Sequence, residues 1–236
     1  MTEILCYDDS YLREFDATVI DTAPKGVMLD RTAFYPGGGG QPADSGTLTA
    51  GEVPYTVKRL SRQDGKLVHE IDGDLPPVGA SMHGELDWDR RYLLMRTHTA
   101  LHILCGVVWR DYGAQVTGGN MQPGSARMDF EFENMSADFA ERMETLVNEE
   151  VQAARGIEIK TLPREEAFSI PDLIRTKINL LPPAITEIRT VNITGLDLQA
   201  DGGTHVANTS EVGAISVVGH ESKGRINKRL RIRIDA

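Results

Sequence analysis

Two pairs of side chains, each spaced by four residues, have the composition of a metal-binding site. His98 and His102 lie in a long apolar run, and Asp201 and His205 enclose two glycines and a threonine much later in the chain. On an α-helix, side chains at positions i and i+4 lie on one face with their Cβ atoms about 5–6 Å apart, so two imidazoles can bind one ion. Zn²⁺ accepts both imidazole nitrogen and carboxylate oxygen, and the glycines let the second segment fold closely over an ion. Two histidines that merely belong to a hydrophobic core are the alternative interpretation.

The first pair stands in the strongest helical pattern of the chain, residues 88–112. Apolar side chains recur there at steps of three and four residues, and Gly113 can end the helix. The histidines fall on or beside the apolar face, which turns them toward the core. Metalloproteases of the His-Glu-x-x-His type have glutamate directly after the first histidine, whereas this chain has Thr99, so peptide hydrolysis of that type is not expected. Cys105, on the same face, is expected in the core.

The second pair follows a predicted strand, Glu187–Ile193, in a half of the chain that mixes helices with strands. A second helix is predicted to end near Arg155, and 117–120 is predicted to be a glycine-rich link. This pattern predicts an α+β domain over residues 88–236. Its other predicted strands are 126–132, 157–162, 211–219 and 229–234.

Residues 1–87 predict a small β-barrel. Short apolar or alternating segments are separated by turn signals such as Asp64-Gly65 and Asp72-Gly73. Short strands at such close spacing are typical of small barrels. The predicted strands are 15–20, 26–29, 47–48, 53–60, 66–71 and 82–86.

A run of four glycines, Gly37–Gly40, lies inside the barrel region and is followed by Gln41. Consecutive glycines disfavour regular structure and let a backbone approach a ligand closely. No Gly-Lys-Ser/Thr follows and the run opens no helix, so it is neither a P-loop nor a dinucleotide-binding fingerprint. On composition alone, a flexible hairpin tip is the alternative interpretation.

The composition describes an acidic globular protein. Its net charge of −10 argues against general polyanion binding, although local charge decides any one contact. The last fourteen residues carry six lysines and arginines against one acid, Asp235, so a partner of tRNA size is compatible with the sequence. The N-terminus lacks a secretory signal pattern and no apolar run reaches membrane-spanning length, which predicts a cytoplasmic protein. Cys6 and Cys105 do not form a disulfide framework.

Three motifs together resemble the AlaX proteins, which are freestanding relatives of the editing domain of alanyl-tRNA synthetase. The motifs are His98-Thr-Ala-Leu-His102, Gly202-Gly203-Thr204-His205 and, upstream, Gly38-Gly39-Gly40-Gln41-Pro42-Ala43-Asp44-Ser45-Gly46. The resemblance covers nearly the whole chain. It implies a barrel domain with the glycine motif, residues 1–87, followed by the α+β editing domain shared with threonyl-tRNA synthetase, residues 88–236. Because the chain stops soon after its last predicted strand, it resembles the medium-length form.

The resemblance implies hydrolysis of wrongly charged tRNA(Ala), chiefly the seryl ester with the glycyl ester as a second substrate. A pocket for alanine discriminates weakly against slightly larger or smaller residues, so accuracy needs a second sieve. One Zn²⁺ per chain is implied, bound by His98, His102, Asp201 and His205. The family has cysteine where this chain has Asp201. If Asp201 binds, four protein ligands and the family's formal charge are kept; if it does not, three histidines leave a position open for water.

The resemblance also implies roles for residues around the metal. Gln41 and Thr32 form the implied catalytic group, in which Gln41 reaches the site and Thr32 hydrogen-bonds the seryl hydroxyl; an ordinary turn hydroxyl is the alternative for Thr32. Lys228 and Arg229 fall where the editing domain has basic residues near its substrate, the 3′ acceptor end of the tRNA. The other residues implied to contact substrate are Gly38, Gly39, Gly40, Asp44 and Thr204.

Two further functions fit the same residues. One is a zinc hydrolase of a small ester or amide, which would act on free aminoacyl esters but not on charged tRNA. The other is a non-catalytic RNA-binding module with a closed structural zinc site, which would bind tRNA without deacylating it. Arginines 229, 231 and 233 alternate with apolar residues, so one sheet face carries all three; such a face suits a phosphate backbone, and a solvated strand is the alternative.

Overall fold

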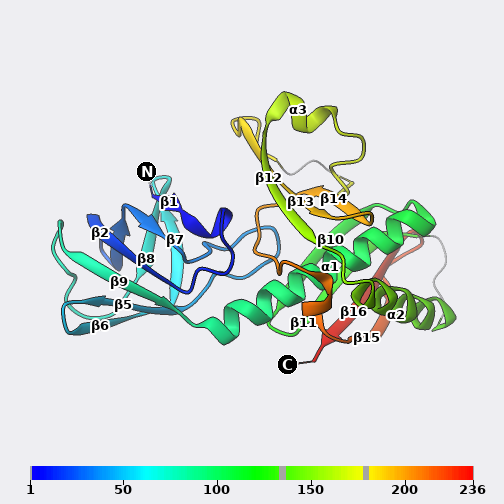
Figure 1. Cartoon of the computed structure of the whole chain (residues 1–236), viewed down its shortest axis with the longest axis horizontal. Helices are drawn as coiled ribbons and strands as arrows, with labels where there is room; N and C mark the ends of the chain where they lie inside the picture. Colours follow the sequence, from blue (N-terminus) through cyan, green and yellow to red (C-terminus); the bar gives the residue numbers. More distant parts are fainter. Residues whose placement is uncertain (1, 133–136, 178–180, 236) are drawn as a thin grey trace. The chain divides into compact units, whose positions relative to one another are not determined.

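The computed structural model describes residues 2–132, 137–177 and 181–235. The chain divides into two compact units, Met1–Tyr92 and Leu93–Ala236 (Figure 1). The boundary falls inside the long helix α1 (Trp88–Tyr112), whereas the sequence placed it just before this helix. The N-terminal unit is built mainly of antiparallel strands, and the C-terminal unit combines helices with antiparallel sheets, which confirms the predicted α+β class.

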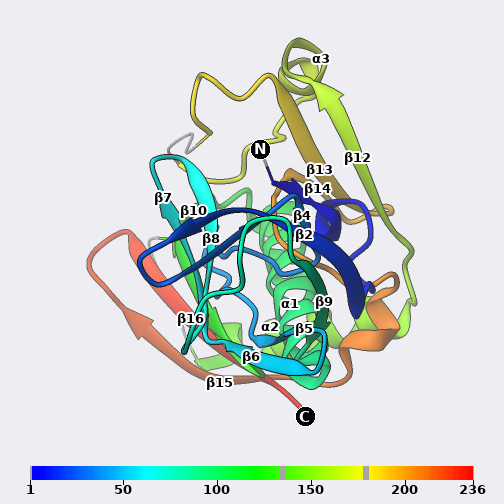
Figure 2. The same ribbon diagram turned by 90° about the vertical axis from the view of Figure 1, so that its left-hand side faces the viewer.

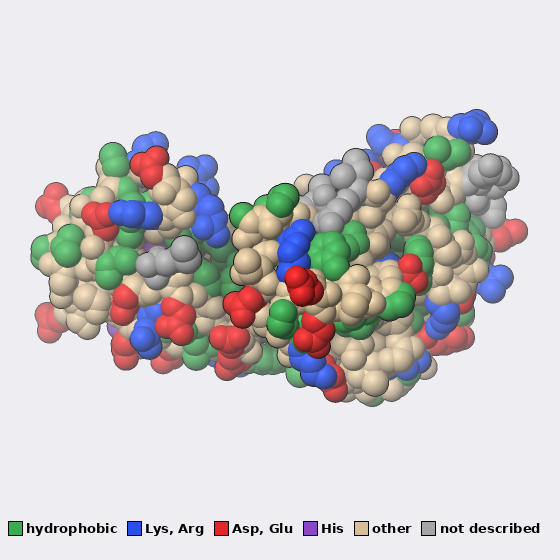
Figure 3. All heavy atoms as spheres, turned by 90° about the horizontal axis from the view of Figure 1, so that it is seen from above, with side chains coloured by type: hydrophobic (Ala, Val, Ile, Leu, Met, Phe, Trp, Pro, Cys, Tyr) green, Lys and Arg blue, Asp and Glu red, His purple; other side chains and the backbone are tan. Residues whose placement is uncertain are grey.

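The charge distribution on the surface and the polarity of the helices are those of a globular protein. On the face seen in Figure 3, acidic and basic side chains are interspersed, and histidine side chains are almost absent. None of the helices in the described part of the chain has the length and apolar character needed to cross a membrane.

Over residues 2–92, the N-terminal unit is built on one antiparallel sheet with strand order β6-β5-β9-β2-β3-β8-β7. A short parallel pair, β1 (Glu3–Ile4) with β4 (Arg31–Thr32), and the 3-10 turn η1 (Leu5–Tyr7) accompany the sheet. The strands of the sheet are β2 (Glu14–Ala23), β3 (Gly26–Leu29), β5 (Gly46–Ala50), β6 (Val53–Val57), β7 (Arg59–Gln63), β8 (Lys66–Glu70) and β9 (Ser81–Leu86).

This sheet curls around its own core, as the predicted barrel requires (Figure 2). β2 pairs with β9 up to Thr18 and with β3 from Val19 onward, and a register shift between Val19 and Asp21 marks a bulge. A bulge bends its strand and increases the local twist. Val57 and Leu60 stand on the two opposite edge strands, yet both belong to one buried cluster. The barrel is therefore open, with its two edges brought round to a shared core.

The prediction of a single strand over 53–60 is wrong. The chain breaks at Lys58, whose backbone N–H donates to the carbonyl of Glu70 instead of continuing the pairing of β6. The residues on either side of the break belong to opposite edges of the curled sheet, so the apolar pattern continues while the hydrogen-bond partners change.

The C-terminal unit contains two sheets and the helices of the second half. Its four-stranded sheet has the order β10-β11-β16-β15 and its three-stranded sheet the order β12-β13-β14. The helices are α1, α2 (Ala137–Gln152), α3 (Arg164–Ser169) and the 3-10 turn η2 (Thr209–Val212). The strands are β10 (Val116–Gln122), β11 (Ser125–Glu131), β12 (Ile157–Pro163), β13 (Glu187–Ile193), β14 (Asp197–Ala200), β15 (Ile215–Ser222) and β16 (Asn227–Ile234).

Two sequence predictions in this unit are wrong. The glycine-rich link at 117–120 is part of the edge strand β10, where Gly118 and Gly119 pair with Asp129 and Met128 of β11. Pairing with a neighbouring strand outweighs the weak strand preference of glycine. The predicted strand 211–219 begins only at β15, because Asn208 and Glu211 form a capping box that makes η2 first.

Helix α1 positions the first histidine pair. From residue 97 to residue 108 every side chain is buried, so the helix is enclosed on all sides there and not only on one apolar face. A helix that is apolar all round belongs in the interior. Gly113 ends it as predicted, with a positive φ of 62° and an N–H that donates to the carbonyl of Trp109. Its two histidines are accordingly only 4% and 6% exposed.

Candidate metal centre

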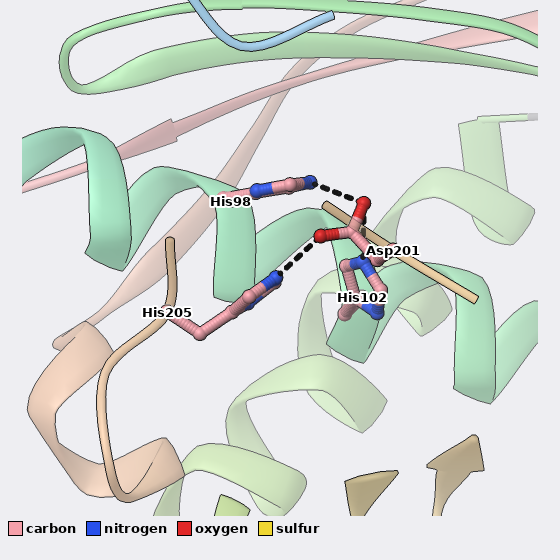
Figure 4. Close-up of side chains that lie close together, drawn as sticks. All are labelled: His98, His102, Asp201 and His205. Atoms are coloured by element: carbon pink, nitrogen blue, oxygen red, sulfur yellow. Dashed lines mark hydrogen bonds and ion pairs between the residues drawn. The ribbon is translucent and has the colours of Figure 1, made fainter. Parts of the chain in front are cut away.

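The four predicted ligands lie together in the C-terminal unit. His98 and His102 come from α1, and Asp201 and His205 from the loop that follows β14; their ring nitrogens and carboxylate oxygens face one another (Figure 4). One ligand atom from each residue lies within 4.8 Å of all the others. The structure thus groups Asp201 with the three histidines. This position is the one that Asp201 needs if it is the fourth metal ligand.

Asp201 stands at the middle of the group. Its Oδ1 lies 3.5 Å from His98 Nε2 and 3.9 Å from His102 Nε2, and its Oδ2 lies 3.1 Å from His205 Nε2. Around a tetrahedral Zn²⁺ with bonds of about 2.0–2.1 Å, ligand atoms are separated by about 3.3 Å. The three separations from the Asp201 oxygens bracket that value, and all four ligand atoms lie within 4.8 Å of one another. The residues therefore fit a four-coordinate zinc with only small side-chain adjustments.

At neutral pH three of the four ligand groups are in the protonation state that binds a metal, whereas His102 has to release a proton to do so. Burial lowers the pKa of His98 to about 4 and the pKa of His205 well below its usual value. For Asp201, burial raises the pKa, but the surrounding histidines outweigh it and hold the pKa well below its usual range. Burial also lowers the pKa of His102, but hydrogen bonds to Asp197 and Asp201 outweigh it and raise that pKa to about 9. Two neutral imidazoles and an ionised carboxylate are thus already in the form that binds a cation.

Each histidine is also held from its outer side. His102 Nδ1 lies 3.2 Å from Asp197 Oδ2, and His205 Nδ1 lies 3.2 Å from Thr99 Oγ1. His98 is hydrogen-bonded to the backbone of Thr204. Thr99 Oγ1 additionally accepts the N–H of Val206, which fixes this hydroxyl between helix and loop. Such outer contacts select the ring tautomer and aim the inner nitrogen at the metal.

The loop that carries Asp201 and His205 is clamped from β13. Arg189 donates from Nη1 to the carbonyl of Asp201 at 3.1 Å and to that of Gly203 at 2.8 Å. Within the loop, the N–H of Gly203 donates to Asp201 Oδ2 at 2.6 Å. The carboxylate is thereby oriented by its own loop before any ion is bound.

The glycine motif belongs to the N-terminal unit and is a hydrogen-bonded loop, not the flexible tip that composition allowed. All four residues of Gly37–Gly40 have positive φ, between 57° and 140°, which side chains disfavour. Gly38 and Gln41 exchange two backbone hydrogen bonds, of 3.0 and 2.9 Å, across the turn. A Cβ at Gly37 would lie 3.1 Å from the backbone nitrogen of Ala43. The glycines are therefore required by the shape of the loop.

The base of this loop rests on a buried ion pair that the sequence did not reveal. Asp44 Oδ2 accepts the N–H of Tyr35 at 2.6 Å and the Nε of Arg91 at 2.9 Å. Both charged side chains are buried, with exposures of 0% for Arg91 and 1% for Asp44. The sequence predicted that Asp44 contacts substrate, and that role remains a prediction beside its structural contacts with Tyr35 and Arg91.

Thr32 and Gln41 are also buried in the N-terminal unit. Thr32 Oγ1 lies 2.8 Å from His69 Nε2 and accepts the N–H of Phe34 at 3.2 Å. Burial lowers the pKa of His69 to about 4, so this partner is neutral at physiological pH. The four metal ligands belong to the other unit, and the roles of Thr32 and Gln41 at a common site remain predictions.

The predicted basic residues of β16 have intramolecular partners. Arg229 donates to Asp129 of β11 through Nε at 2.6 Å and Nη2 at 2.7 Å, and this ion pair lowers the pKa of Asp129. Lys228 Nζ donates to Ser222 Oγ at 3.0 Å and to the carbonyls that follow it in the β15–β16 connection. Arg229 thus links β16 to β11, and Lys228 holds the connection between β15 and β16. Arg231 and Arg233 are the exposed members of the predicted face.

Sequence reasoning missed the outer residues of the centre. Thr99 was noted only because it is not glutamate, and Arg189 and Asp197 lie in no recognisable motif. Thr99 is a polar residue in the buried middle of α1, and this was the one sequence feature that could have indicated an outer contact. The other contacts join distant segments and have no sequence period.

The chain was compared with protein-family models and with known proteins. One matching protein-family model, described as tRNA synthetases class II (A), covers residues 5–90, and another, described as threonyl and alanyl tRNA synthetase second additional domain, covers residues 188–231. The chain is 42% identical to alanyl-tRNA editing protein AlaX-M of Saccharolobus solfataricus and 36% identical to AlaX-M of Methanosarcina barkeri, with 98% of each chain covered in both cases. It is 37% identical to alanine–tRNA ligase of Ignicoccus hospitalis, matching 92% of this chain and 24% of that enzyme. The chain belongs to the AlaX-M family of alanyl-tRNA editing proteins.

Proposed function

We propose that this protein deacylates mischarged tRNA(Ala) by hydrolysing the ester between the wrong amino acid and the terminal ribose. The observation that carries the proposal is the buried group of three histidines and one aspartate, in a chain that matches AlaX-M editing proteins over nearly its full length. Seryl-tRNA(Ala) is the principal substrate and glycyl-tRNA(Ala) the second. Both amino acids differ from alanine by one small group. The aminoacylation pocket of a synthetase discriminates poorly against such a difference.

The metal that suits the centre is Zn²⁺. The donor set is three imidazole nitrogens and one carboxylate oxygen, all of which zinc accepts, and the buried position excludes the waters that Mg²⁺ and Ca²⁺ usually retain. A bound zinc would supply a Lewis acid for the ester carbonyl or for an attacking water. The ionised carboxylate of Asp201 offsets one unit of its charge.

The protein side chains supply position and exclude water. His98, His102 and His205 present one nitrogen each inward while their outer contacts fix the rings. The rigid glycine loop presents Gly38, Gly39 and Gly40 as backbone that substrate can approach closely, with Gln41 at its end. Thr204 contributes its backbone to the centre through His98.

One assay separates this function from its two rivals. Zinc-loaded protein is incubated with seryl-, glycyl- and alanyl-tRNA(Ala), and ester loss is followed together with hydrolysis of free seryl esters. We expect rapid loss of the seryl ester, slower loss of the glycyl ester and retention of the alanyl ester. Hydrolysis of free esters without action on charged tRNA would instead identify a small-ester hydrolase. Binding of tRNA without any ester loss would identify an RNA-binding module.

Replacing Thr32 by valine tests the proposed recognition of the seryl hydroxyl. Loss of a hydrogen bond of about 1–1.5 kcal/mol should lower the ratio of seryl to alanyl ester hydrolysis about tenfold. The measurement is kcat/KM for both esters. Thr32→Ser keeps the hydroxyl and its contact with His69, and should retain selectivity. Unaltered selectivity in Thr32→Val would remove Thr32 from the site.

The exposed arginines of β16 test the predicted interaction with phosphates. Arg231 and Arg233 lie on the outer face of the strand, while the apolar residues between them are buried. In Arg231→Gln/Arg233→Gln, the slope of log binding constant against log salt concentration should fall by about 1 for each phosphate that the variant no longer neutralises. Arg142→Gln, on the exposed face of α2, is the control. A slope equal to that of the unmodified protein would show that this face does not bind tRNA.

A further inference from the structure

A buried charged pair lies behind His102, on the side away from the other metal ligands. Asp197 Oδ2 lies 3.2 Å from His102 Nδ1 and accepts the Nε2 of Gln199 at 2.6 Å. Its other oxygen, Oδ1, lies 3.5 Å from Arg175 Nε. The exposures of the two charged side chains are 0% for Asp197 and 10% for Arg175. Neither residue belongs to the group of four ligands.

Local packing brings Asp197 to this position. Gly106 stands on α1 one turn after His102, and a Cβ there would lie 2.8 Å from Leu196 and 3.0 Å from Asp197. Only a glycine allows the turn between β13 and β14 to approach the helix this closely. The chain therefore has a specific means of placing a carboxylate next to the outer nitrogen of His102.

Arg175 is brought in by a separate segment, after α3. Its carbonyl accepts the N–H of Val116, and the carbonyl of Val116 accepts the N–H of Lys177, so the segment is fixed against β10. Its guanidinium lies 4.5 Å from the ring centroid of Trp109. Nε and Nη1 of Arg175 have no hydrogen-bond partner among the described residues, so the contact between Nε and Asp197 is an ion pair without a hydrogen bond.

The charges around the His102 imidazole come from two carboxylates and one guanidinium. His102 lies between two carboxylates, Asp201 on the inner side and Asp197 on the outer side. Two buried carboxylates near one ring require a cation, because an unpaired buried charge is costly. Arg175 supplies that cation on the outer side, which leaves the charge of Asp201 available to the metal.

We infer that Asp197 is a positioning residue of the metal centre and that Arg175 acts through it as its counter-charge. Asp197 holds the proton of His102 on Nδ1 and so keeps Nε2 directed at the metal; Arg175 and Gln199 hold the Asp197 carboxylate in that orientation. The inference rests on the proposed metal centre, but it concerns residues outside the ligand set.

The test measures metal binding directly. Zinc affinity is determined by chelator competition, and the ligand field by visible absorption of the Co²⁺-substituted protein, for Asp197→Ala, Asp197→Asn, Arg175→Met and the Asp197→Ala/Arg175→Met double variant. Loss of an outer-sphere partner of a ligand usually weakens metal binding 10–100-fold, and we expect a loss of about that size in Asp197→Ala, with an altered Co²⁺ spectrum. Arg175→Met should weaken binding in the unmodified background and have no further effect in the Asp197→Ala background.

The matched control is Asp16→Asn. Asp16 Oδ1 lies 2.9 Å from His83 Nδ1 in a solvent-exposed carboxylate–histidine pair away from the centre, and its replacement should leave zinc binding unchanged. If Asp197→Ala does not fold, the nearly isosteric Asp197→Asn and the double variant, which removes both charges, give the result. Zinc affinity within about twofold of the unmodified protein and an unchanged Co²⁺ spectrum in these variants would overturn the inference while leaving the proposed function intact. Failure of the unmodified protein to bind zinc would overturn the metal centre itself, and the inference with it.

Discussion

Replacing Asp201 by alanine should abolish tight metal binding. The carboxylate lies between all three histidines and carries the one negative charge among the four ligands. Loss of an outer-sphere partner alone usually weakens binding 10–100-fold, so loss of a ligand should weaken it by at least about 100-fold. The measurements are zinc content after dialysis and affinity by chelator competition. Deacylation of seryl-tRNA(Ala) should fall with metal content.

Two further substitutions at the same position separate charge from ligation. Asp201→Asn keeps the shape but removes the charge, and should bind zinc weakly. Asp201→Cys introduces a thiolate, the ligand that the family resemblance implies at this position; the longer Zn–S bond, about 2.3 Å, partly compensates for the shorter side chain. The cobalt form of this variant should show thiolate-to-metal charge-transfer absorption that the unmodified protein lacks. Asp16→Ala removes a carboxylate from the His83 pair and is the control. Equal zinc content and affinity in Asp201→Ala and the unmodified protein would instead assign a three-histidine centre with an open position.

The metal ligands could be predicted from sequence because their geometry is mostly local. His98 and His102 share a helical face, and Asp201 and His205 share one short loop, so a single long-range contact completes the group. Asp197 shares no such pattern with His102. Its contact depends on how closely a β-turn packs on Gly106, and one sequence gives no sign of that distance.

The same reasoning explains which strands were predicted. Alternating segments in the N-terminal unit, such as β2 and β9, were recognisable because each buries one face of the sheet. β10 was missed because its glycines conceal a strand that depends on pairing with β11. The break at Lys58 was missed because apolar periodicity reports burial and not the identity of the neighbouring strand.

Replacing Arg91 by methionine should strongly destabilise the N-terminal unit. Arg91 is fully buried and joins three segments: it donates to Asp44, to the carbonyl of Ser10 at 2.9 Å and to the carbonyl of Ala33 at 2.6 Å. Removing one partner of a buried ion pair leaves the other charge uncompensated and costs about 3–5 kcal/mol. The free energy of unfolding, followed by the fluorescence of Trp88 in a variant that lacks Trp109, measures the loss. Because Asp44 holds the neck of the glycine loop, the remaining folded protein should also lose deacylase activity.

The double variant Arg91→Met/Asp44→Ala tests the cause of this loss. Removing both charges avoids an unpaired buried carboxylate, so the double variant should be more stable than Arg91→Met alone. Arg91→Lys keeps the charge, but an ammonium lacks the fork of donors that reaches three segments, and it should recover only part of the stability. Lys58→Met breaks an ion pair with Asp72 whose side chains are 65% and 76% exposed, and should change stability little. If Arg91→Met is no less stable than Lys58→Met, the ion pair does not stabilise the unit. A loss of activity without a loss of stability would then assign Arg91 to the shape of the glycine loop and not to the stability of the unit.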